Sequence, residues 1–259
     1  MDKSDKPKRY KRGIYLLPNL FTTAALFCGF YAIIAAMQNH FIVAAIAIFI
    51  AMLLDGLDGR VARLTNTQSD FGAQYDSLAD LISFGLAPSL VMYQWSLLNM
   101  GKAGWLVAFI YAATAALRLA RFNTQVGTAD KNYFQGLPSP AAAAIVAGAV
   151  WVGQDYNVTG RLVDIAAMIV TVTAGLLMVS NIRYHSFKAI DFKGKIPFFL
   201  LLMIMLVIVF ISYEPPTILF GLFVIYAVSG PVFTLIEIRK RRALRRAYKK
   251  ARKLRKNND

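Results

Sequence analysis

The stretch DGLDGRVARLTNTQSDFGAQYDSLAD, residues 55–80, decides the fold because it places four carboxylates at or beside the ends of two apolar segments. Inserting a carboxylate at bilayer depth costs a free energy of roughly 2.5 to 3.5 kcal/mol on insertion scales. Such a group is therefore expected only where a partner neutralises it and the protein's function requires it. Asp55 and Asp58 are three residues apart and Asp76 and Asp80 four apart, so each pair shares one helical face. The short polar run between them makes the two helices antiparallel neighbours, and we expect the pairs to face each other.

Four like charges this close repel one another, so bound cations are needed to keep them ionised together. All four side chains offer hard oxygen ligands and no Cys or His lies in the stretch, which favours Mg²⁺ or Mn²⁺ over zinc. We expect two divalent ions held by Asp55, Asp58, Asp76 and Asp80. The neighbouring small and basic residues would let a phosphate-bearing ligand approach the backbone: Gly56, Gly59, Ala62, Arg63 and Gly72.

Composition places the chain in the membrane class. Hydrophobic residues make up 57% of the 259 residues, which exceeds what one soluble core needs. A hydrocarbon layer of about 30 Å takes roughly 20 helical residues to cross. Apolar segments occur at about 16–38, 40–64, 73–98, 103–123, 138–153, 162–181, 196–213 and 216–238. The sequence therefore predicts an all-α polytopic membrane bundle of about eight transmembrane helices at 16–238, between a basic tail at 1–15 and a basic extension at 239–259.

Charge predicts the orientation of this bundle. The two tails hold 18 of the 29 Lys and Arg residues, and an even number of spans puts both tails on one side, which the positive-inside rule makes cytoplasmic. The aspartates then lie at the cytoplasmic edge. A net charge of +15 could also indicate nucleic acid, but the basic residues cluster beside the spans, so we expect none to bind. The basic C-terminal run is predicted to form a helix along an anionic leaflet. A role only in fixing the membrane topology would explain these basic residues equally well.

The pattern D-x-x-D-G-x-x-A-R-x8-G-x-x-x-D-x-x-x-D, from Asp55 to Asp80, resembles the signature of the CDP-alcohol phosphotransferase family. These are integral membrane enzymes that move a phosphatidyl or phosphoalcohol group from a CDP-linked donor to an alcohol and release CMP. Three further strings resemble the members of that family that use serine as the acceptor. They are Ser83-Phe84-Gly85-Leu86-Ala87-Pro88-Ser89, Arg118-Leu119-Ala120-Arg121-Phe122-Asn123 and Gly136-Leu137-Pro138-Ser139-Pro140.

The resemblance implies a six-helix core with extra helices, CDP-diacylglycerol as donor, L-serine as acceptor and a homodimer among membrane lipids. It also implies that Asp80, the fourth aspartate, is the catalytic base for the acceptor hydroxyl. We expect the protein in the bacterial inner membrane, as a multi-pass protein with termini and active site cytoplasmic. Asn19 opens the first span and suits a helix cap as well as it suits a nucleotide contact, and the resemblance favours the contact. The predicted donor-binding residues are then Asn19, Gly59, Ala62, Arg63 and Gly72.

Arg118 and Arg121 lie three residues apart on one face near the inner end of the fourth span, where an unpaired cation is costly. They could pair with the aspartates, reach the headgroups, or hold an acceptor carboxylate or a donor phosphate. We expect the functional role and place Arg118, Arg121, Asn123 and Ser83 at the acceptor.

Two other functions remain open. A sibling enzyme would use glycerol 3-phosphate, inositol phosphate or choline, and phosphate acceptors would call for more cationic residues around the pocket. A cation transporter is more distant, since its carboxylates would be expected near the midplane between interrupted repeats.

Overall fold

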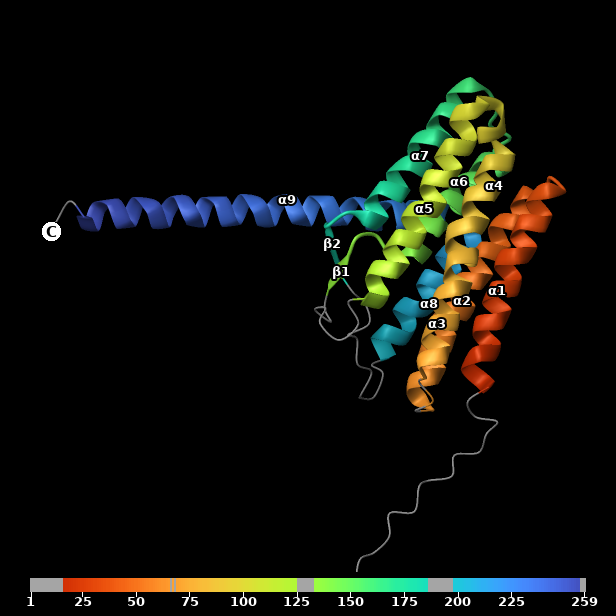
Figure 1. The fold of residues 1–259 in the computed structure, drawn as a ribbon, viewed down its shortest axis with the longest axis horizontal. Coiled ribbons are helices and arrows are strands. Elements are labelled where there is room, and N and C mark those ends of the chain that lie inside the picture. Colours follow the sequence, from red (N-terminus) through yellow and green to blue (C-terminus); the bar gives the residue numbers. More distant parts are fainter. Residues whose placement is uncertain (1–15, 66, 68, 125–132, 186–197, 257–259) are drawn as a thin grey trace, which may run out of the picture.

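The computed structural model describes residues 16–65, 67, 69–124, 133–185 and 198–256. Its first half is helical, with short connections that keep successive helices adjacent (Figure 1). In chain order the elements are α1 (Leu16–Met37), α2 (Phe41–Leu64), α3 (Asp70–Asp80), the π-helix η1 (Leu81–Leu86), α4 (Ala87–Trp95), the 3₁₀-helix η2 (Leu97–Met100) and α5 (Lys102–Thr124).

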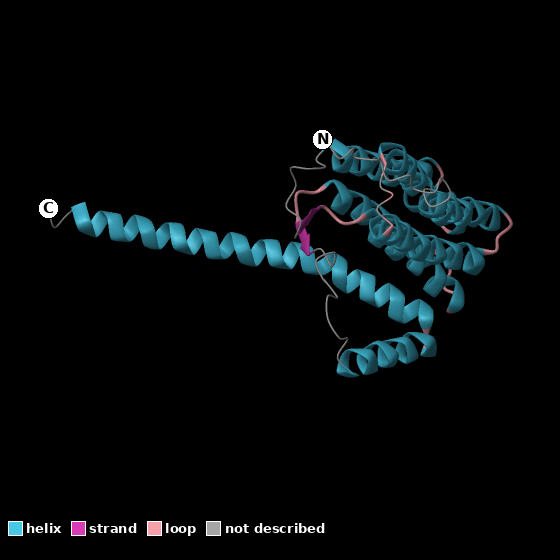
Figure 2. Ribbon diagram, turned by 90° about the horizontal axis from the view of Figure 1, so that it is seen from below, coloured by secondary structure: helices cyan, strands magenta, loops and turns pink. Residues whose placement is uncertain are grey.

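The second half adds four helices and two short strands. They are β1 (Tyr133–Gln135), α6 (Ser139–Asp155), α7 (Arg161–Val179), β2 (Arg183–His185), α8 (Phe198–Tyr213) and α9 (Pro215–Lys256). The strands pair antiparallel, with Phe134 opposite Tyr184. Figure 2 shows α8 beside the start of α9, on one side of the remaining helices, while the C-terminal half of α9 extends beyond them.

The expected all-α membrane architecture is confirmed. Five helices of the described chain are long and apolar enough to cross a membrane: Leu17–Met37, Phe41–Leu64, Lys102–Thr124, Arg161–Val179 and Pro215–Ile236. The other three predicted spans are shorter as uninterrupted helices, because α6 has 17 residues, α8 has 16, and η1 divides the third segment. The figure of about eight spans therefore stays a prediction.

Three features differ from the expected pattern. The third segment contains the π-helix between α3 and α4. The paired strands were not predicted, because each has only three residues. The basic run after residue 238 is not a separate element, since α9 runs without a break from Pro215 to Lys256.

Small residues allow the helices to pack closely. Buried alanines recur along α1, α2 and α6, the pattern that brings helix backbones together in membranes. Between α1 and η1, for example, a Cβ added to Gly29 would lie 2.7 Å from the Cα of Ser83. Helix α1 thereby packs against α2, α3, η1 and α4 and joins the two helices that carry the aspartates.

Candidate active site

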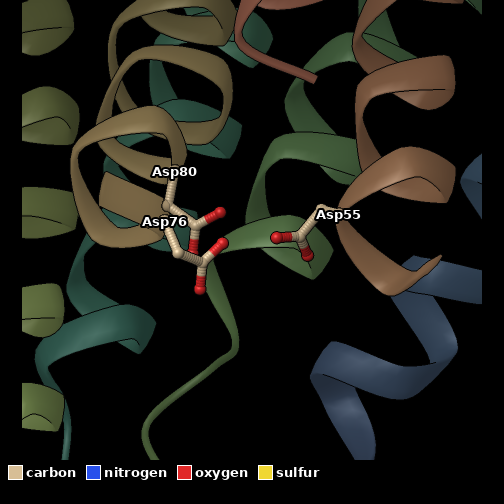
Figure 3. A group of neighbouring side chains, drawn as sticks. All are labelled: Asp55, Asp76 and Asp80. Atoms are coloured by element: carbon tan, nitrogen blue, oxygen red, sulfur yellow. The ribbon is translucent and has the colours of Figure 1, made fainter. Parts of the chain in front are cut away.

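Three of the four predicted aspartates converge. Asp55 from α2 points across the space between the helices toward Asp76 and Asp80 from α3 (Figure 3). One carboxylate oxygen of each lies within 4.8 Å of the others, and all three side chains are partly buried. The local sequence sets this geometry, because Ser69 caps α3 by accepting a hydrogen bond from the Gly72 amide at 3.0 Å. Helix α3 starts there and brings both of its aspartates to one face.

Asp58 lies beside this group rather than within it. Its side chain is buried and its Oδ2 accepts a hydrogen bond of 2.8 Å from the Thr22 hydroxyl of α1. Electrostatic interactions still link it to Asp55 and Asp76. The predicted set of four is therefore divided into three carboxylates that meet and a fourth that Thr22 holds next to them.

The α2 side of the site is open. A Cβ added at Gly56 or Gly59 would meet nothing within 4 Å. Arg63 is exposed one turn further along α2, and Ala62 is partly buried. The glycines therefore leave backbone accessible beside the carboxylates, as the sequence predicted for a bulky polar ligand.

The start of α1 forms another part of the site. Asn19 lies close to Gly72, since a Cβ added to Gly72 would be 3.5 Å from Asn19 Oδ1. Thr23 donates to the Asn19 carbonyl at 2.7 Å, and its hydroxyl also lies 2.9 Å from the Tyr75 hydroxyl of α3. Two predicted donor-binding residues distant in sequence are thus adjacent in space.

The two arginines of α5 have different surroundings. Arg118 is buried, its Nη1 donates to Ser139 Oγ at 2.7 Å, and electrostatic interactions link it to Asp80 and Asp55. Its Nε has no hydrogen-bond partner among the described residues. Arg121 instead reaches the strands and the end of α7, where its Nη2 donates to Gln135 Oε1 at 2.5 Å and to Asn181 Oδ1 at 2.6 Å.

The two remaining predicted acceptor residues make contacts between helices. Ser83 is fully buried and donates to the Ala25 carbonyl of α1 at 3.1 Å. Asn123 lies nearer the aspartates, because its Nδ2 donates at 3.0 Å to the hydroxyl of Ser77, the residue that follows Asp76. Asn123 therefore joins the end of α5 to the helix that carries two of the carboxylates.

Sequence reasoning missed Thr22 and Ser139 as partners of site residues. Thr22 acts on a residue 36 positions away, a pairing that no local pattern reveals. Ser139 falls inside the Gly136–Pro140 string that the resemblance singled out. Its bond to Arg118, 21 residues away, could not be predicted from that string.

A bundle of apolar helices that joins three carboxylates beside exposed helix backbone defines an integral membrane protein with an acidic centre suited to phosphate-bearing substrates. The family model described as CDP-alcohol phosphatidyltransferase matches residues 15–180. The chain belongs to this family and is a membrane-embedded transferase of phospholipid biosynthesis.

Individual relatives agree with that assignment. A CDP-diacylglycerol–serine O-phosphatidyltransferase of Helicobacter pylori is 41% identical over 226 residues, which cover 87% of this chain and 94% of the relative. The enzyme of the same name from Bacillus subtilis is 34% identical over 172 residues, or 66% of this chain and 91% of the relative. In Mycobacterium tuberculosis a third is 42% identical over 148 residues, or 54% of this chain and 51% of the relative.

Proposed function

We propose that this protein transfers the phosphatidyl group of CDP-diacylglycerol to the hydroxyl of L-serine, giving phosphatidylserine and CMP. The observation that carries the proposal is the convergence of Asp55, Asp76 and Asp80 within the family signature, beside the open face at Gly56 and Gly59. The names of the relatives support serine as the acceptor. A sibling acceptor is not favoured.

The donor set fits a hard divalent cation. The three converging ligands are all carboxylate oxygens, and the described residues place no Cys or His in the group. Asp55, Asp76 and Asp80, with Asp58 beside them, would hold two Mg²⁺ or Mn²⁺ ions. Such ions, when bound, neutralise charge on the diphosphate of the donor. Thr22 keeps the fourth carboxylate within reach of the other three.

The donor would lie along the open side of α2. Gly59 and Ala62 leave room for the diphosphate, and the exposed guanidinium of Arg63 can donate to its oxygens. The adjacent pair Asn19 and Gly72 would contact the nucleotide at the aqueous edge. The acyl chains would then lie between helices in the bilayer.

The acceptor would lie between Asp80 and Arg118. Asp80 takes the proton of the serine hydroxyl, and the oxygen forms a bond to the lipid-linked phosphorus. The bond from that phosphorus to the bridging oxygen of the diphosphate breaks, and the bridging oxygen leaves with CMP. The guanidinium of Arg118 would hold the serine carboxylate, which is supported by its burial and by its Nε having no hydrogen-bond partner among the described residues. Asn123 and Ser83 stay predicted acceptor residues, whereas we assign Arg121, which was predicted with them, to packing because it donates to Gln135 and Asn181.

The acceptor assay tests this function. Purified protein in mixed micelles with CDP-diacylglycerol and Mg²⁺ is given labelled serine, glycerol 3-phosphate, inositol phosphate or choline in parallel, and lipid product and CMP are measured. Only serine is expected to give lipid product with equimolar CMP. Product from another alcohol would make the protein a sibling enzyme, and the absence of CMP with every acceptor would favour a transporter. Asp55→Asn serves as the inactive control.

The proposed orientation puts both tails and the active site in the cytoplasm of a bacterial inner membrane. Cys28 is the only cysteine, so Cys28→Ser gives a background for single-cysteine labelling. In spheroplasts, a cysteine replacing Lys102, the first residue of α5, is expected to react with an impermeant maleimide, whereas one replacing Ser4 is expected to react only after lysis. The reverse pattern would invert the proposed topology. Homodimerisation, which rests on the resemblance alone, is tested by the mass of the detergent complex.

A further inference from the structure

Two prolines within the described helices each remove the α-helical hydrogen-bond donor of one backbone carbonyl. Pro88 stands where η1 passes into α4, and Pro231 lies inside α9. A proline has no amide hydrogen, so the carbonyl four residues earlier loses its α-helical partner. Those carbonyls belong to Phe84 and Ala227.

Each of these carbonyls accepts a hydrogen bond from a tyrosine on another element. Tyr111 of α5 donates to the Phe84 carbonyl at 3.1 Å, and Tyr184 of β2 donates to the Ala227 carbonyl at 3.0 Å. Both tyrosines are fully or almost fully buried. The two contacts are chemically the same, which makes one a natural control for the other.

Only the first of these contacts lies on the element that follows Asp80, whereas the second adjoins Tyr226, which interacts with Arg118. Asp80 is the last residue of α3, and η1 begins at Leu81. Helix α5 packs closely against this π-helix, because a Cβ added at Gly85 would lie only 3.1 Å from Ala115 Cβ. Tyr111, Ala115 and Arg118 are spaced along one face of α5, so the face that holds η1 also carries the arginine linked to Asp80.

We propose that Tyr111 is a positioning residue for Asp80, an inference that rests on the proposed role of Asp80 as base. The Tyr111 hydroxyl stabilises the π-helical register of Leu81–Leu86. If that segment relaxed to α-helix, one residue would leave the turn and Asp80 would rotate by about 100° relative to α4. Asp80 would then no longer face Asp55, and Asp76 would turn away with it because both lie on α3.

The test compares Tyr111→Phe with Tyr184→Phe. Each variant removes one hydroxyl and leaves one proline-freed carbonyl without that donor, so both are expected to lower the melting temperature by similar amounts. Only Tyr111→Phe should reduce kcat, by roughly tenfold or more and by a larger factor than either KM changes, because a displaced base no longer takes the serine proton. Equal kcat losses in the two variants, or an unchanged kcat in Tyr111→Phe, would overturn the inference.

A second pair of variants guards against a folding defect in Tyr111→Phe. Gly85→Ala pushes η1 away from α5 without touching the tyrosine, whereas Gly148→Ala makes an equally tight contact, 3.2 Å from Phe220, away from the aspartates. A kcat loss in Gly85→Ala alone supports the proposal, and equal behaviour of the two contradicts it. Mn²⁺ binding measured by electron paramagnetic resonance gives a readout independent of activity. It is expected to weaken in Tyr111→Phe and Gly85→Ala only, so the inference can be tested even if serine transfer is not found.

Discussion

The two parts of the helical chain differ in the role of their side chains. One part is α1 to α7 and the other is α8 with α9. The first group coincides with the family match at residues 15–180 and contains every predicted site residue, from Asn19 to Asn123. In α8 the described large apolar side chains are exposed, except the partly buried Ile211, and the helix packs against α9. The difference indicates that the chemistry depends on a closely packed core of helices. The C-terminal pair adds exposed apolar surface and packs on that core through the contact of α9 with α6 and the Tyr184 hydrogen bond.

Removing divalent metal should have the largest effect, because it removes the activity that we assign to helices α1 to α7. Excess chelator is expected to abolish serine transfer, because Asp55, Asp76 and Asp80 need cations to remain together as carboxylates. Mg²⁺ or Mn²⁺ should restore the rate and zinc should not. The rate is measured by CMP release, with chelator already saturated with Mg²⁺ as the control. Full activity in excess free chelator would contradict a metal-dependent site.

Asp80→Asn should have the next largest effect. If Asp80 takes the serine proton, turnover falls by ~10² to 10⁴ while donor binding survives in part. Asp58→Asn should instead weaken metal and donor binding, since the amide keeps an oxygen but loses charge. Donor binding and turnover are measured for both variants, with a melting curve for each.

Asp164→Asn is the matched control. Asp164 lies at the opposite end of the bundle and accepts a hydrogen bond of 2.6 Å from Ser96, so its loss should lower stability without changing turnover per folded molecule. Near-normal turnover in Asp80→Asn would make Asp80 only a metal ligand.

The two arginines of α5 should separate substrate binding from packing. Arg118→Lys removes a planar donor and is expected to raise the serine KM about tenfold, with a smaller change in the donor KM. Arg121→Lys loses the bonds to Gln135 and Asn181 and is expected to cost roughly 1 kcal/mol of stability with little change in either KM. A larger serine KM in Arg121→Lys than in Arg118→Lys would reverse the assignment.

The sequence predicted what depends on local pattern. The spacing of Asp55, Asp76 and Asp80 on helical faces was enough to predict their convergence, and hydropathy placed α2 within one residue of its observed start. Contacts between distant segments could not be predicted. Three such contacts depend on how helices meet in space: the Thr22 bond that holds Asp58 beside the other carboxylates, the different surroundings of Arg118 and Arg121, and the Tyr111 bond to the Phe84 carbonyl.

Removing residues 239–259 should have the smallest effect. The C-terminal half of α9 extends beyond the other helices in Figures 1 and 2, whereas the half that contacts α6 and receives the Tyr184 hydrogen bond would remain. Serine transfer in mixed micelles is therefore expected to stay within about twofold of wild type, with a similar melting temperature. The control is Tyr184→Phe, which leaves the extension intact but weakens the retained part of α9. A truncated protein that folds normally yet loses transfer in micelles would place part of the chemistry outside α1 to α7. Loss only in vesicles rich in anionic lipid would instead indicate that the basic run acts on the leaflet, where each cation near the surface contributes about 1 kcal/mol.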